Sequence, residues 1–84
     1  MMMGYLDEIK KELPEEFEGV HEYMKLAHEA RDSGHPEHAQ ILHDMAWEEY
    51  THAKHLKCML EGVHAEHPDY YEKMMKAEAE LHNW

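Results

Sequence analysis

Apolar residues recur at intervals of three and four, and no segment of the chain alternates with a period of two. The clearest example surrounds a Glu-x-x-His step, Glu49 to His52, with Leu42, Met45, Ala46, Ala53, Leu56 and Leu60. Residues at this spacing share one face of a helix, whereas a half-buried strand would show strict alternation. The sequence therefore predicts an all-α fold without a sheet.

Proline and glycine predict where the helices begin and end. The spacing of Leu6, Ile9 and Leu13 predicts a short amphipathic helix that ends at Pro14. We expect Pro14 to open a second helix, which runs to about Asp32, because proline is favoured in the first helical turn.

A turn over residues 33–36, with the sequence Ser-Gly-His-Pro, separates this helix from a third one that runs to Glu61 and stops at Gly62. A last helix opens at 67–69 and places these residues on one side: Tyr70, Met74, Ala77, Leu81 and Trp84. We predict a single domain over residues 1–84, in which a core hairpin over 14–61 carries short flanking helices.

The length and net charge of the chain limit which partners and assemblies we expect. A chain of 84 residues encloses only a marginal core, so we expect self-association. With 19 acidic and 8 basic residues the formal net charge is −11, which argues against nucleic acid as a partner. The charge also favours the attraction of cations, although a solvated surface explains it equally well.

The remaining composition suits a cytoplasmic location. Cys58 is the single cysteine, so the chain has no internal disulfide and no Cys-x-x-Cys metal site. The residues before Tyr5 lack the features of a signal peptide, and no run reaches transmembrane length. We therefore predict a cytoplasmic protein with no membrane partner. Most of the ten histidines are expected at the surface, with a His-rich metal buffer as an alternative.

Three ionisable residues fall inside the apolar faces. On a helical wheel Glu16 lies within the apolar arc of its helix, while Glu49 and His52 lie near the centre of the stripe on the next one. Antiparallel pairing brings these positions to about the same level. Because an unpaired buried charge costs several kcal/mol, the group predicts a bound metal ion. Carboxylate oxygens and imidazole nitrogens suit iron, manganese or zinc.

The stretch from Glu16 to Leu60 resembles one half of the ferritin-like four-helix bundle, and most closely the first helix pair of rubrerythrin. The resemblance rests on these residues: Glu16, Tyr23, Ala27, the turn glycine Gly34, the Glu49-x-x-His52 motif, Ala53 and Lys54. It implies a carboxylate-bridged di-iron site in which Glu49 bridges and Glu16 and His52 are further ligands. It also implies a catalytic role for these ligands and for Tyr23, which would hydrogen-bond to a ligand carboxylate.

The chain has one helix pair and one Glu-x-x-His motif, whereas a full-length ferritin-like protein has two of each. A two-fold axis through the site would supply two copies each of Glu16, Glu49 and His52, which is the six-ligand set of carboxylate-bridged bundles. Half-length proteins such as the encapsulated ferritins build a metal site in this way. The resemblance therefore implies a homodimer, or a higher oligomer of dimers, that completes a four-helix bundle around two iron ions.

Several functions fit these residues. The first is oxidation of Fe(II) by O₂ or peroxide, as in a ferroxidase; a rubrerythrin-like peroxidase would also need a separate electron donor. The alternative is a non-catalytic helical dimer that binds zinc or iron. A metal-free interaction module is a third option. The balance of carboxylate over imidazole ligands favours iron over structural zinc, which is typically bound by cysteines.

Overall fold

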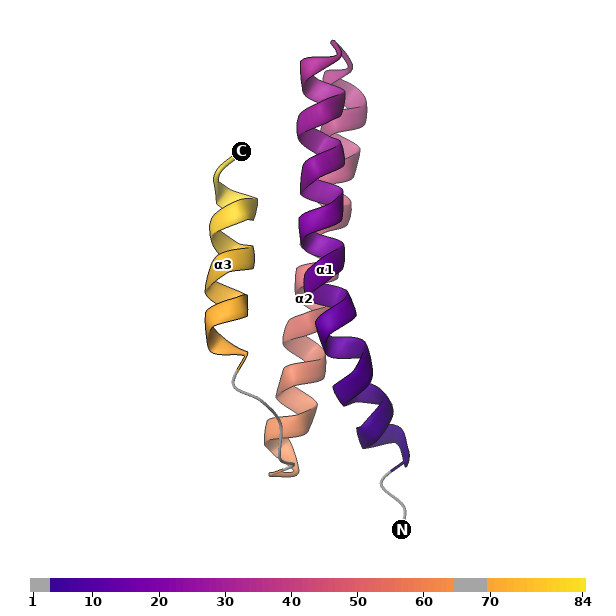
Figure 1. Cartoon of the computed structure of the whole chain (residues 1–84), viewed down its shortest axis with the longest axis vertical. Helices are drawn as coiled ribbons and strands as arrows, with labels where there is room; N and C mark the ends of the chain where they lie inside the picture. Colours follow the sequence, from indigo (N-terminus) through magenta and orange to yellow (C-terminus); the bar gives the residue numbers. More distant parts are fainter. Residues whose placement is uncertain (1–3, 65–69) are drawn as a thin grey trace.

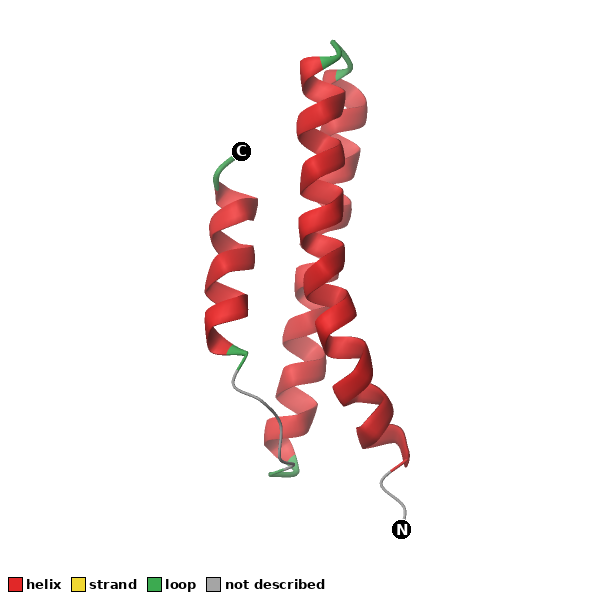
Figure 2. Cartoon of the chain, in the orientation of Figure 1, coloured by secondary structure: helices red, strands yellow, loops and turns green. Residues whose placement is uncertain are grey.

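The computed structural model describes residues 4–64 and 70–84, and over these residues the chain forms three helices and no strand. They are α1 (Gly4–Asp32), α2 (Pro36–Gly62) and α3 (Tyr71–His82). Figure 1 shows α1 and α2 as an antiparallel hairpin with α3 alongside it, and Figure 2 shows how little of the described chain lies outside helices. The all-α prediction is confirmed. The predicted opening of the last helix at 67–69 lies outside the described residues.

The turn between α1 and α2 forms as predicted. Gly34 has φ +84°, a left-handed conformation that glycine adopts without strain. Its amide donates to the carbonyl of Arg31 at 3.0 Å, and the His35 amide donates to that of Ala30 at 2.9 Å. This pair of hydrogen bonds is a Schellman cap, which satisfies the last carbonyls of α1. Pro36 then occupies the first turn of α2, where its missing N–H is not needed.

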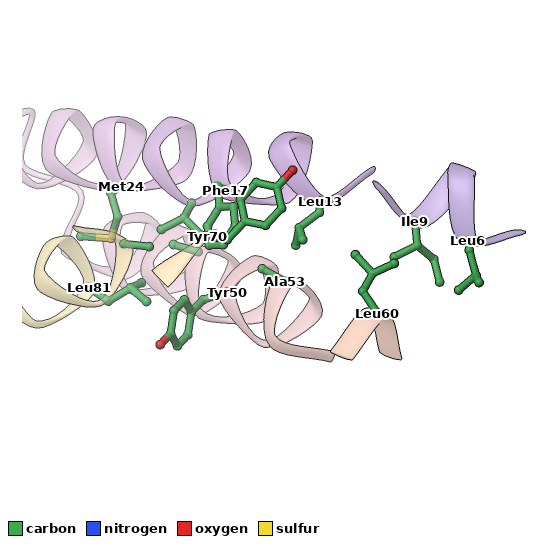
Figure 3. Packing of buried hydrophobic residues seen from close by; sticks show 13 residues of the cluster. Leu6, Ile9, Leu13, Phe17, Met24, Tyr50, Ala53, Leu60, Tyr70 and Leu81 are labelled. Carbon is green, nitrogen blue, oxygen red and sulfur yellow. The ribbon is translucent and has the colours of Figure 1, made fainter. Parts of the chain in front are cut away.

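The predicted helix boundary at Pro14 is wrong, because α1 continues through this residue. Proline inside a helix removes a hydrogen bond and costs about 3 kcal/mol. The apolar face explains why the helix persists: Leu13 and Phe17 are both buried and four residues apart, so the stripe keeps its phase across Pro14. Breaking the helix would expose the turns before Pro14, which pack near Leu60 (Figure 3). Figure 1 shows α1 changing direction in this region, as expected at a proline.

The seam between α1 and α2 follows a seven-residue repeat on both helices. On α1 the buried residues include Leu13, Val20 and Ala27. On α2 the repeat consists of Ala39, Ala46, Ala53 and Leu60. Residues seven apart fall on the same face of a helix, so the two seams meet along the hairpin. Ala46, Ala53 and Leu60 belong to the apolar stripe predicted around the Glu-x-x-His step, whereas Leu42, Met45 and Leu56 of that stripe are only half-buried and lie beside the seam.

Helix α3 covers one face of the hairpin. The predicted apolar side of this helix is confirmed, because Ala77, Leu81 and the preceding Tyr70 are buried. The ring of Tyr70 stacks on Phe17 of α1 at a centroid distance of 5.8 Å (Figure 3). Helix α3 also contacts α2, because the Tyr50 hydroxyl of α2 donates a hydrogen bond of 2.7 Å to Glu78 of α3.

The opposite face of the hairpin, which we call the open face, is not covered by any described helix. Its members lie in seven-residue steps beside the seam: Glu16, Gly19, Tyr23 and Leu26 on α1, and Leu42, Met45, Glu49, His52, Leu56 and Met59 on α2. The Cα atoms extend over 52 × 21 × 14 Å, so the molecule is a thin slab. No described helix is long and apolar enough to cross a bilayer.

Candidate metal centre

The open face brings together Glu16, Glu49 and His52, as the sequence predicted. The Nδ1 atom of His52 lies 3.5 Å from the Glu16 Oε2 atom and 3.9 Å from the Glu49 Oε1 atom. One potential ligand atom from each side chain lies within 4.8 Å of the other two. Two helices therefore place two oxygens and one nitrogen around a single point near the middle of the hairpin.

Their burial differs from the expectation that all three point into a core. The side chains of Glu16 and Glu49 are 18% and 26% exposed, whereas that of His52 is 56% exposed. Two helices share only one seam, and the alanines of α2 occupy it. Glu49 and His52 lie beside this seam on the open face, so the helices described in a single chain cover the site from one side only.

The environment disfavours the ionised form of Glu49. Burial raises the pKa of its carboxyl from 4.5 to about 7; a hydrogen bond and the negative charge of Glu16 also raise it. The charge of Glu48 adds a smaller increase, and His52 acts in the opposite direction. Two acidic groups thus lie together in a setting that poorly supports two negative charges. A cation between them would remove this repulsion.

One oxygen of the group has no hydrogen bond to the described residues. The Oε2 atom of Glu16 is fully buried and accepts no hydrogen bond from any described residue. Its contact with the His52 ring at 3.5 Å falls in the range of an ion pair but does not meet hydrogen-bond geometry. Buried carboxylate oxygens are normally hydrogen-bonded or bound to a cation. The unpaired oxygen, together with the donor set of carboxylates and imidazole, fits a divalent metal ion.

Sequence reasoning missed Gly19, which lies between Glu16 and Tyr23 on α1. A Cβ atom at this position would lie 2.6 Å from the Glu49 Oε2 atom. The backbone of Gly19 has no left-handed conformation, so its torsion angles do not require glycine. A glycine inside a helix costs about 1 kcal/mol relative to alanine. The sequence did contain one indication: Gly19, three positions after Glu16, is a residue type that is unfavourable inside a helix.

The two tyrosines near the site behave differently. Tyr23 lies half-buried on the open face, and its hydroxyl forms no hydrogen bond to a described residue. Its predicted bond to a ligand carboxylate stays a prediction. Tyr50, adjacent to Glu49, is buried on the other side and holds α3 through Glu78. Burial, aided by this hydrogen bond, raises the pKa of Tyr50 to about 12, so the hydroxyl stays protonated.

Comparison with known proteins yielded no match: no family model matches the sequence, and neither the curated proteins nor the solved structures contain a significant relative. A function is therefore inferred from the side chains of the open face.

Proposed function

We propose that this chain is a di-iron carboxylate protein that oxidises Fe(II) at a site shared by two copies of the chain. The observation that carries the proposal is the convergence of Glu16, Glu49 and His52 within 4.8 Å, with a buried Glu16 oxygen that accepts no hydrogen bond from the described part of the chain. The resemblance of the same residues to the rubrerythrin helix pair supports iron, with manganese and zinc as other ions the donors suit.

The open face supports a homodimer. Two large apolar side chains of this face are substantially exposed in the single chain, Leu26 at 44% and Met59 at 46%. Together with the half-buried Leu42, Met45 and Leu56 they make an apolar face with a polar centre, which is typical of an interaction site. Glu49 lies at the middle of α2, and Glu16 lies within one turn of the middle of α1. A two-fold axis through the site therefore lets two hairpins overlap along their whole length and complete a four-helix bundle.

A second copy of the chain also completes the set of metal ligands. Two copies would supply four carboxylates and two imidazoles, enough for two metal ions. Four negative charges offset most of the charge of two divalent ions, which permits the site to be buried in the dimer. His52, more than half exposed in the single chain, would then be covered by the second copy.

The reaction takes Fe(II) as its substrate. Two Fe(II) ions give one electron each to hydrogen peroxide, which takes up two protons and leaves as two waters. With O₂ as oxidant, four Fe(II) ions and four protons yield two waters. Glu16, Glu49 and His52 bind the iron, and the carboxylates favour the higher charge of the Fe(III) product. Repeated reduction of peroxide would need a separate electron donor. The lone, exposed Cys58 suits the reducing cytoplasm that we predict for the protein.

The deciding experiment measures iron per chain and solution mass after growth in iron-supplemented anaerobic medium. We expect about one iron per chain in a dimer, because six ligands from two chains hold two ions. Glu49→Ala should lose the iron. The matched control is Glu48→Ala, which removes the neighbouring exposed carboxylate and should retain it. Absence of transition metal from the wild-type protein would refute the proposal.

A non-catalytic zinc site is the second candidate, and one observation favours it. The ligand atoms of Glu16, Glu49 and His52 converge within one chain, so each chain offers zinc three protein ligands without a contribution from a second copy. This candidate predicts one zinc per chain of a helical dimer and no oxygen or peroxide consumption when Fe(II) is added. A dimer with two iron ions that oxidises Fe(II) would exclude it.

A further inference from the structure

We infer that Gly19 is a positioning residue: its missing side chain provides the space in which the Glu49 carboxylate lies beside Glu16. This inference rests on the proposed metal site and adds to it a residue that binds no metal itself.

The contacts of a side chain at this position are specific. The three nearest atoms to a Cβ built on Gly19 all belong to Glu49: Oε2 at 2.6 Å, and Cδ and Cγ at 3.2 Å. No backbone atom of α2 is among them. The closest neighbour of a side chain at this position is therefore one acidic side chain, not the backbone of the facing helix. At 2.6 Å the two groups cannot coexist, so any larger residue displaces the carboxylate.

Displacement of the Glu49 carboxylate would disturb the metal site and leave the fold intact. The Glu49 carboxylate ends a flexible side chain at the edge of the seam, so it can swing away without moving α1 or α2. In its present position its Oε1 atom lies 3.9 Å from the His52 Nδ1 atom, within the group of potential ligands. A carboxylate pushed away from α1 leaves this group. Gly19→Ala should therefore weaken metal binding while improving the intrinsic helix propensity of α1.

Other glycines of the chain provide the control. A Cβ on Gly62, at the end of α2, would meet nothing within 4 Å. Gly62→Ala makes the same chemical change in a helix without approaching Glu49. Gly19→Leu extends the test, because its larger side chain would occupy the whole space of the carboxylate.

The experiment titrates Fe²⁺ into the metal-free full chain without oxygen and follows heat, with a parallel thermal melt of each metal-free variant. Altered supporting residues typically reduce metal affinity by about 10–100-fold. We expect a loss in this range for Gly19→Ala, no detectable binding for Gly19→Leu, and wild-type binding for Gly62→Ala. The melting temperature of Gly19→Ala should be equal to or higher than that of the wild type. In the Glu49→Ala background, where no carboxylate must move, Gly19→Ala should raise it by about 4–8 °C.

The outcomes separate the two proposals. Wild-type iron binding that survives both Gly19 substitutions would overturn the positioning role and leave the metal site intact. A melting temperature that falls together with the affinity in Gly19→Ala would assign the glycine to packing, which also overturns the inference. A wild-type protein that binds no Fe²⁺ would overturn both the metal site and the role of Gly19.

Discussion

The two faces of the hairpin use similar residue types in opposite ways. On the face covered by α3, polar side chains are paired: Tyr50 with Glu78, and the His43 ring with the carbonyl of Leu81 at 2.9 Å. On the open face a buried oxygen of Glu16 accepts no hydrogen bond from any described residue, and Glu49 has a raised pKa. The covered face is complete within one chain. The open face has the unsatisfied chemistry expected of a surface that acquires a ligand or a partner.

Substitution of a leucine on each face should give the largest difference in stability. Leu81 is 1% exposed on the covered side, so Leu81→Ala should lower the free energy of unfolding by about 2–5 kcal/mol. Leu26 is 44% exposed, and Leu26→Ala should cost less than about 1 kcal/mol in the metal-free protein. Urea unfolding with a chelator present measures both. Equal losses would mean that the open face is already buried between metal-free chains.

Metal should stabilise the open face and leave the covered face unchanged. A ligand that binds only the folded state at 100 times its dissociation constant adds about 2.7 kcal/mol to the free energy of unfolding. We expect a stabilisation of this order when Fe²⁺ is added to the wild type without oxygen. Glu16→Ala should remove the effect, whereas Glu18→Ala, which changes a nearby exposed carboxylate, should keep it. Thermal melts with and without Fe²⁺ test this, and identical wild-type curves would contradict the metal site.

The pH dependence of the metal-free protein should report on Glu49. The folded state holds its proton up to a pKa of about 7, whereas the unfolded chain releases it near 4.5. Between these values the unfolded state binds fewer protons, so the free energy of unfolding falls as pH rises from 4.5 to 7 and this contribution then levels off. Glu49→Gln should flatten the slope of a urea-midpoint series relative to the exposed control Glu48→Gln. Parallel slopes for the two variants would show that Glu49 does not titrate in this range.

Substitution of a tyrosine on each face should give the smallest difference in the free energy of unfolding. Tyr50→Phe removes the hydroxyl that donates to Glu78 and should cost about 0.5–1.5 kcal/mol. Tyr23→Phe removes a hydroxyl without a hydrogen bond to a described residue and should change the metal-free stability by less than about 0.5 kcal/mol. Denaturant unfolding measures both variants. A larger effect of Tyr23→Phe that appears only with metal would support its predicted bond to a ligand carboxylate.

The sequence by itself determined the helical class, the turn and the three residues of the candidate site. These depend on local rules: the spacing of apolar residues, the left-handed glycine at Gly34, and the shared face of Glu49 and His52. Glu16 was placed beside them by the register of an antiparallel pair, and the structure agrees.

Only the tertiary structure decided which of these features are buried and how they meet. Local preference ends a helix at Pro14, yet packing of the turns before it holds α1 together, because burial along the seam outweighs one lost hydrogen bond. Tyr50 became a core residue because α3 covers its side of α2, and His52 stayed exposed because no described helix covers the other side. The role of Gly19 is visible only across the seam, since the space it leaves is defined by a side chain of the opposite helix.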